Sequence, residues 1–141
     1  MEGRTTLSYD NGEDDTETSD APMNISNNAG GSLWPAIAAQ GDDVYAVWAD
    51  DTAAAGQSEI LFAKSSDGGA TFSSTIALSE SELFAHKPDI AVSNDNVYVV
   101  WEDHNLDEQA AVAFRSSSDG GETFGDTTIL ATMTARAWTR M

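Results

Sequence analysis

Two short polar runs, each directly after an apolar segment that ends in Trp, contain the residue types best suited to chemistry. With the tryptophan that precedes each run, they are Trp48, Asp50 and Asp51, and then Trp101, Glu102, Asp103 and His104. Carboxylate oxygens are the ligands that Ca²⁺ prefers, and carboxylates beside aromatic rings suit sugars. We therefore predict a ligand face at these two runs. Its candidate calcium ligands are Asp50, Asp51, Glu102 and Asp103. Asp-rich turns are also common in solvated loops, so turns without a ligand are the alternative.

No cofactor other than calcium is predicted. His104, beside Asp103, is a candidate metal ligand, but a single exposed histidine usually binds no metal, and the indication at His86 is no stronger. The chain has no Cys, which excludes disulfides and thiolate metal sites.

The charge balance excludes several classes of partner. Acids outnumber bases by 24 to 6, which gives a net charge of −18, and the bases are scattered. Nucleic acid and anionic lipid need clustered Lys and Arg, so neither is expected as a partner. No run approaches the ~18 apolar residues of a membrane helix, and no signal peptide is visible at the N-terminus. Residues 1–22 predict a disordered acidic segment.

An internal repeat organises the sequence from Met23 onward. The segment Val44–Trp48 (VYAVW) recurs as Val97–Trp101 (VYVVW), 53 residues later. Further on, Ser65–Phe72 (SSDGGATF) recurs as Ser117–Phe124 (SSDGGETF), 52 residues later. A period near 50 is typical of propellers and solenoids.

Each copy of the repeat predicts four short strands. They are Pro35–Ala39, Val44–Asp50, Glu59–Ser65 and Thr71–Leu78, and then Pro88–Ser93, Val97–Asp103, Ala111–Ser117 and Thr123–Leu130. The second strand of each copy is apolar on both faces, which fits stacked blades. We expect the repeats to fill residues 23–131, as two complete units of about 26–78 and 79–130, with a partial flanking strand near Met23–Ser26. Residues 132–141 are unassigned, either a tail or the start of a third repeat.

The sequence Ser-x-Asp-Gly-Gly-x-Thr-Phe occurs once in each copy, between the third and fourth predicted strands. Its residues are Ser65, Asp67, Gly68, Gly69, Thr71 and Phe72, and then Ser117, Asp119, Gly120, Gly121, Thr123 and Phe124. Glycine supplies the positive φ of a tight turn, and an Asp carboxylate accepts N–H groups of its own turn. We therefore expect a structural role, and we do not expect Asp67 and Asp119 to be catalytic acids.

This motif resembles the Asp box, or BNR repeat, of sialidases and related β-propellers. The resemblance implies an all-β fold of propeller blades, each a four-stranded antiparallel sheet, with the Asp boxes on the face opposite the ligand site. Sialidases of this family use an arginine triad, a Tyr–Glu nucleophile pair and an Asp acid. The repeats hold one arginine, Arg115, and residues 33–35 (LWP) and 86–88 (HKP) lack the arginine expected there. We therefore predict no catalytic residue and no enzymatic activity for this chain alone.

Two blades leave apolar outer faces and unpaired strand edges. We expect the ring to close by self-association, with a homotrimer giving six blades, or with the missing blades of a longer chain. The first functional hypothesis is a noncatalytic module that binds a ligand such as a glycan, or acts as a scaffold, outside the cell or at its surface. The alternatives are a fragment or subunit of a sialidase-like exo-glycosidase and a Ca²⁺-stabilised extracellular adhesion domain.

Overall fold

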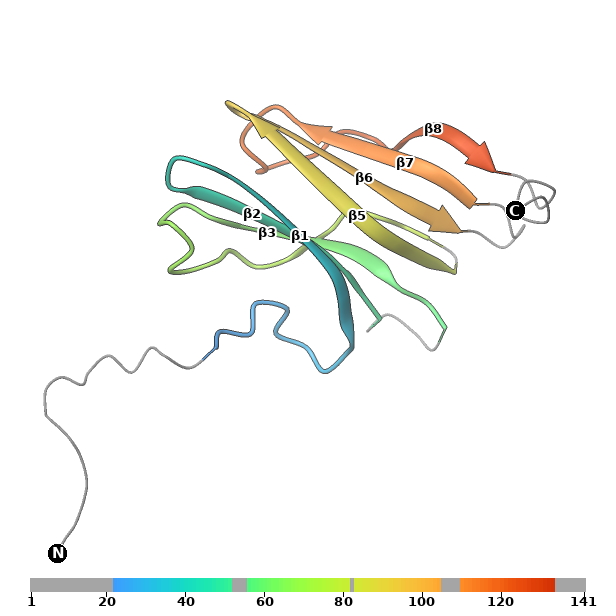
Figure 1. The fold of residues 1–141 in the computed structure, drawn as a ribbon, viewed down its shortest axis with the longest axis horizontal. Helices are drawn as coiled ribbons and strands as arrows, with labels where there is room; N and C mark the ends of the chain where they lie inside the picture. Colours follow the sequence, from blue (N-terminus) through green and yellow to red (C-terminus); the bar gives the residue numbers. More distant parts are fainter. Residues whose placement is uncertain (1–21, 52–55, 82, 105–109, 134–141) are drawn as a thin grey trace, which may run out of the picture.

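The chain forms two four-stranded antiparallel sheets, each a simple up-and-down meander (Figure 1). The computed structural model describes residues 22–51, 56–81, 83–104 and 110–133. The first sheet contains β1 (Ser32–Gln40), β2 (Asp43–Asp50), β3 (Glu59–Ser65) and β4 (Ile76–Ala77). The second contains β5 (Phe84–Ser93), β6 (Asn96–His104), β7 (Ala110–Ser117) and β8 (Thr128–Met133). The prediction of two four-stranded antiparallel sheets is confirmed. Apart from its last residue, the predicted acidic segment 1–22 lies outside the described residues.

The first strand of each sheet contains a β-bulge at its proline. In β1 the pair Trp34–Pro35 together opposes Trp48 of β2. In β5 the pair Lys87–Pro88 together opposes Trp101 of β6. Proline has no N–H to donate to the ladder, and a bulge lets a strand continue past it. The prediction that these strands begin at the prolines is therefore wrong, because both strands start earlier and run through the bulge.

The outermost strands also differ from the prediction. They were expected over residues 71–78 and 123–130, but β4 covers only Ile76–Ala77 and β8 begins at Thr128. The residues before them belong to the Ser-x-Asp-Gly-Gly-x-Thr-Phe turns, whose hydrogen bonds are local and compete with strand pairing. β8 continues to Met133, so the first two residues of the unassigned stretch 132–141 belong to the second sheet. Residues 134–141 lie outside the described part of the chain.

The segment before β1 is not the predicted flanking strand. Residues 22–31 form turns beside the first sheet, in which Asn24 Oδ1 accepts the backbone N–H groups of Ser26 at 3.1 Å and Asn27 at 3.2 Å. A fourth strand needs the third strand of its own sheet as a partner. The two sheets of the described chain are each complete already, so this segment has nothing to pair with.

The main core lies between the two sheets. Its buried residues on β2 and β6 are Tyr45, Val47, Ala49, Val97, Val99 and Trp101. Side chains alternate along a strand, so Tyr98 and Val100 point away from the first sheet. Tyr45 and Tyr98 are equivalent in the repeat, yet Tyr45 is 1% exposed and Tyr98 is 39% exposed. The sheets therefore stack in the same orientation, and neither described sheet covers the outer face of β6.

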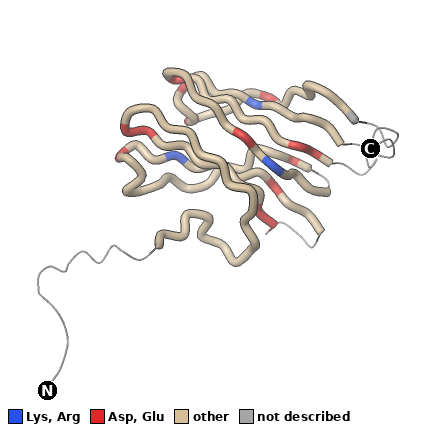
Figure 2. Tube along the Cα trace, in the orientation of Figure 1, with Lys and Arg blue, Asp and Glu red and all other residues tan. Residues whose placement is uncertain are grey.

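Charged residues are spread over the molecule without a basic cluster among the described residues. Figure 2 shows the blue Lys and Arg positions separated from one another, and they lie on β3, β5 and β7. The red Asp and Glu positions gather at strand ends and turns. Within the described ranges, no helix has the length and apolar character that crossing a membrane requires.

Candidate functional site at the rim of the two sheets

The polar runs and the bulges lie at one end of the sheets, which we call the rim. In the first sheet, Asp50 pairs with Ser32 and Glu59 at this end, whereas Val44 pairs with Ser65 at the opposite end. In the second sheet, β6 ends and β5 begins at the rim in the same way. The rim and the Ser-x-Asp-Gly-Gly-x-Thr-Phe turns therefore lie at opposite ends of the strands.

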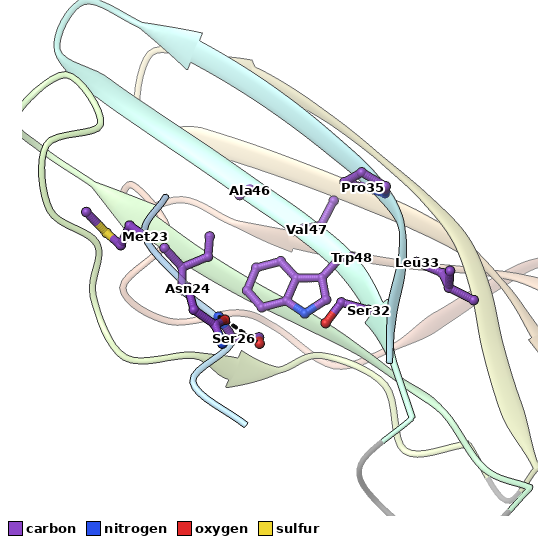
Figure 3. Close-up of a pocket in the computed structure, with 10 residues that line it drawn as sticks. Met23, Asn24, Ser26, Ser32, Leu33, Pro35, Ala46, Val47 and Trp48 are labelled. Carbon is purple, nitrogen blue, oxygen red and sulfur yellow. Dashed lines mark hydrogen bonds between the residues drawn. The ribbon is translucent and has the colours of Figure 1, made fainter. Parts of the chain in front are cut away.

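The two tryptophans of the predicted ligand face are buried and bind carboxylates of their own strands. Trp48 Nε1 donates to Asp50 Oδ2 at 3.2 Å, and Trp101 Nε1 donates to Asp103 Oδ2 at 2.8 Å. Trp48 is 5% exposed and Trp101 2%. Trp48 and Ser32 of β1 both line a pocket of about 300 Å³, and Figure 3 shows the indole of Trp48 beside Ser32. This Trp-x-Asp contact is thus repeated in both sheets.

The carboxylates at the end of β2 accept hydrogen bonds from residues 28–32, at the start of β1 and just before it. Asp50, 1% exposed, also accepts hydrogen bonds from Asn28 Nδ2 at 3.2 Å and from Ser32 Oγ at 2.9 Å. Asp51 accepts the backbone N–H of Gly31 through Oδ1. Asp103 accepts a hydrogen bond of 2.7 Å from the Ser81 hydroxyl. The calcium site expected from these residues stays a prediction.

A second cluster joins β5 and β6 at the rim. Phe84 pairs with His104 and His86 pairs with Glu102, so all four side chains lie on one face of the sheet. His104 Nε2 lies 3.3 Å from Glu102 Oε1, and the ligand atoms of both histidines and Glu102 all lie within 4.8 Å of one another. The Phe84 ring is 4.6 Å from that of His104 and 4.7 Å from that of His86. Burial, with the neighbouring His104, lowers the pKa of His86.

Each bulge places one side chain at the rim, Trp34 in the first sheet and Lys87 in the second. Trp34 has a φ of 52° and Lys87 a φ of 54°, which is uncommon for residues other than glycine. Trp34 is 42% exposed, and its indole lies 4.8 Å from the ring of His86. Lys87 Nζ lies 3.8 Å from Glu102 Oε1.

A pocket of about 400 Å³ opens between the two sheets at the rim. Its walls include Leu33, Trp34, Asp51, Ser58, Phe84 and His86. Asp51 was predicted at this ligand face, whereas the aromatic walls were not. Two bulges and a cross-strand pairing bring these residues together, and the signal for the bulges was the shared x-Pro step at residues 34–35 and 87–88.

The first of the two Ser-x-Asp-Gly-Gly-x-Thr-Phe turns spans residues 65–72, and its Asp accepts a network of local hydrogen bonds. Asp67 Oδ1 accepts from Ser65 Oγ at 2.7 Å and from the Thr71 N–H at 2.8 Å, and Asp67 Oδ2 accepts from Thr71 Oγ1 at 2.6 Å. These bonds, led by that of the Thr71 hydroxyl, lower the pKa of Asp67 to about 2. In the second turn, residues 117–124, the same contacts join Ser117, Asp119 and Thr123. They lower the pKa of Asp119 further.

The two turns differ in what surrounds them. Gly69 has a φ of 93° and open space around it, whereas a Cβ on Gly121, at a φ of 87°, would lie 2.7 Å from Phe62 Cζ of the first sheet. Phe124 of the second turn also packs edge-on against Phe62 at 5.0 Å. Phe72 of the first turn is half-buried. The second turn is therefore part of the contact between the sheets, and the first turn is open.

The arginine of the described residues, Arg115, binds backbone carbonyls. Its guanidinium donates to the carbonyl oxygens of Gly125 at 2.6 Å, Leu78 at 2.9 Å and Phe124 at 3.2 Å. Leu78 follows β4 of the first sheet, so Arg115 links the second turn to the other sheet. This geometry gives Arg115 a structural role and leaves the rim of the described chain without a guanidinium.

The fold, unlike the sequence, has matches among known proteins. No protein-family model and no curated protein matches the sequence. The solved structure of Hadza microbial sialidase Hz136 is similar, with a TM-score of 0.57 and 16% identity over 73% of this chain and 25% of that chain. The GH43_1 enzyme from Xanthomonas citri, solved with xylose, gives a TM-score of 0.54 and 12% identity over 74% and 33%. The RS223 β-xylosidase gives a TM-score of 0.50 and 11% identity over 66% and 34%.

These likenesses show the fold. The two stacked four-stranded sheets are two blades of a β-propeller. The chain spans between 25% and 34% of the length of the three solved chains, so it is similar to a part of each.

Proposed function

We propose that this chain is a noncatalytic β-propeller module that binds a carbohydrate at the rim between its two blades. The rim pocket supports this proposal, because the rings of Trp34, Phe84 and His86 line it together with the carboxylate of Asp51. The faces of a sugar ring carry C–H groups that stack on aromatic rings, and its edge carries hydroxyls that bond to carboxylates. Small-molecule sites generally combine such apolar walls with a few polar groups.

The placement of the cationic residues supports binding without catalysis. The bulges, where the sialidase resemblance implies an arginine, carry Trp34 and Lys87. Arg115 donates to three backbone carbonyls instead. A ligand carboxylate is held best by the two parallel N–H groups of a guanidinium, which an ammonium does not reproduce.

The local hydrogen bonds of Asp67 and Asp119 support the assignment of both turns as Asp boxes with a structural role.

Ring closure is proposed to occur by self-association, with three chains giving six blades, outside the cell or at its surface. The stacking supports it, because the outer face of the second sheet is equivalent to the face that the first sheet buries. Blades of a longer chain are the alternative partner.

A glycan array probed with the purified whole chain tests the carbohydrate proposal. We expect binding to a limited set of glycans, and loss of that binding in Trp34→Ala. Leu130→Ala is the matched control, because Leu130 is a 56% exposed apolar residue on the outermost strand, β8. Equal loss in both variants, or no bound glycan, would contradict the proposal.

A fragment or subunit of an exo-glycosidase is the second candidate. It is favoured by the likeness to a sialidase, a GH43_1 enzyme and a β-xylosidase, of whose chains this chain covers 25% to 34%. Hydrolysis of fluorogenic sialosides or xylosides by the purified chain would establish it in place of the noncatalytic proposal. A third candidate, a calcium-stabilised adhesion domain, predicts that Ca²⁺ raises the melting temperature of chelator-treated protein. An unchanged melting temperature would remove it.

A further inference from the structure

We propose that His86, Glu102 and His104 bind a Zn²⁺ ion at the rim of the second blade, through two imidazoles and one carboxylate. This inference goes beyond the carbohydrate proposal and is tested without any glycan, although His86 also lines the rim pocket. The ion would have three protein ligands and an open coordination position.

The strand pairing creates this ligand set. His86 lies opposite Glu102, and His104 lies two residues beyond Glu102 on the same face of β6. The three ligand atoms lie within 4.8 Å of one another, and the pair Glu102 Oε1–His104 Nε2 is at 3.3 Å. With metal–ligand bonds of about 2.0–2.2 Å, tetrahedral zinc ligands lie roughly 3.3 Å apart. One pair therefore already has this separation, and side-chain rotation of half-buried residues closes the remainder.

Comparison with the first blade shows that the fold does not require these three residues. The repeat equivalents of His86, Glu102 and His104 are Leu33, Ala49 and Asp51, each 53 residues earlier. The first blade thus builds the same strands and bulge without either imidazole, and with Ala49 in the place of the glutamate. The second blade carries the ligand set as an addition to the shared architecture.

The surroundings orient the ligands and limit water. Phe84 lies 4.6 Å from the ring of His104 and 4.7 Å from that of His86, and the indole of Trp34 covers His86 at 4.8 Å. A weakly hydrated shell strengthens the attraction between the ion and its carboxylate. The positive charge of Lys87 would repel the ion, because Nζ lies 3.8 Å from Glu102 Oε1. Its side chain is 61% exposed, however, and can turn into solvent when an ion binds.

The ligand types select the ion. Calcium takes six to eight oxygen ligands, whereas imidazole favours zinc and its neighbours in the first transition row. Two histidines and one glutamate with an open position form a known type of zinc site. The proposed site is therefore distinct in chemistry from the calcium site predicted at the aspartates.

Cobalt absorption spectroscopy on the untagged whole chain tests the proposal, because Co²⁺ gives visible bands when it replaces Zn²⁺. We expect about one equivalent of Co²⁺ to bind, Zn²⁺ to displace it, and excess Ca²⁺ to leave it in place. His86→Leu copies the first blade, and His104→Leu removes the second imidazole without supplying another ligand atom. Each should weaken binding at least tenfold. Lys87→Met is the matched control, which removes the adjacent charge but no ligand, and it should bind at least as tightly as the original chain.

Circular dichroism and melting curves of the metal-free variants establish that each is folded. Cobalt bands of equal strength in the folded His86→Leu and His104→Leu variants would overturn the proposal. So would displacement of Co²⁺ by Ca²⁺, or the absence of stoichiometric binding to the original chain.

Discussion

At the scale of single residues, each Ser-x-Asp-Gly-Gly-x-Thr-Phe turn depends on one ionised carboxylate. Asp67 and Asp119 each accept the hydroxyl and the backbone N–H of the Thr four residues later. Protonation removes acceptor capacity from this network, because a carboxylic acid oxygen that bears the proton no longer accepts. The turns are therefore expected to weaken in acid.

The first prediction concerns this acid sensitivity. An ordinary Asp in the unfolded chain has a pKa of about 3.9, and the folded pKa of Asp67 is lowered to about 2. A lowered folded pKa adds stability that is complete above the unfolded value and is lost as the pH falls through the folded value. Urea unfolding between pH 6 and pH 2 should show this loss, and the double variant Asp67→Asn, Asp119→Asn should show a shallower pH dependence.

The control for that experiment is Asp126→Asn, which changes an exposed carboxylate outside both turns. It should keep the pH dependence of the original chain. A double variant whose stability follows pH as steeply as the original chain would show that the two turn carboxylates are not responsible.

The second prediction compares two glycines with the same backbone and different neighbours. Alanine at either position takes a positive φ, which costs about 1–2 kcal/mol. Gly121→Ala also drives a Cβ to 2.7 Å from Phe62, whereas Gly69→Ala meets open space. Overpacking adds about 1–3 kcal/mol, so Gly121→Ala should destabilise more in urea unfolding. Equal losses would indicate that the second turn moves away from the first sheet.

At the scale of elements, the Arg115 side chain stabilises the contact between the blades, in addition to the apolar core between them. Arg115 Nη1 reaches the carbonyl of Leu78, the residue after β4, while Nε binds Gly125 in its own sheet. The third prediction is that Arg115→Met lowers the free energy of unfolding by about 1–3 kcal/mol, because it breaks charge-assisted hydrogen bonds. Arg115→Lys should recover little, since an ammonium lacks the planar fork. Full recovery with Lys would show that charge alone matters.

The elements also show how far the sequence predicts the structure. Strands β2 and β3 match their predicted limits to within a residue, because β-branched and aromatic residues fill them. β4 and the start of β8 were misplaced, because hydrogen bonds within the turns outweigh pairing there. The cluster of His86, Glu102 and His104 depends on which residues face each other across two strands. Spacing along the chain does not reveal that register, because the bulge before Pro88 shifts it, and the two histidines therefore look isolated in the sequence.

At the scale of the whole molecule, the repeat has two unlike outer faces. One is the face of the second sheet that carries Tyr98, and the other is the face of the first sheet that carries Ile37, which is 69% exposed. Their equivalents face each other at the contact between the two sheets. A further blade is therefore expected to dock in the same head-to-tail way, whether another chain or the same chain supplies it.

The fourth prediction is that the chain assembles through these two faces into a discrete trimer. Light scattering should report the trimer mass for the original chain and a monomer for either Tyr98→Glu or Ile37→Glu. An equimolar mixture of the two variants should form heterodimers, because each variant keeps one intact face. A monomeric original chain would show that the missing blades come from elsewhere. Heterodimers that fail to form would contradict the head-to-tail contact.

The bulge at each proline affects how the surface of the rim can change during evolution. It holds the side chain of Trp34 in one blade and Lys87 in the other on the same backbone, outside the buried core. A single codon per blade therefore exchanges an aromatic surface for a cation while the sheets keep their packing. Duplication of such a unit would multiply these variable positions around one axis. Recombination of such blades would give new rim surfaces on an unchanged scaffold.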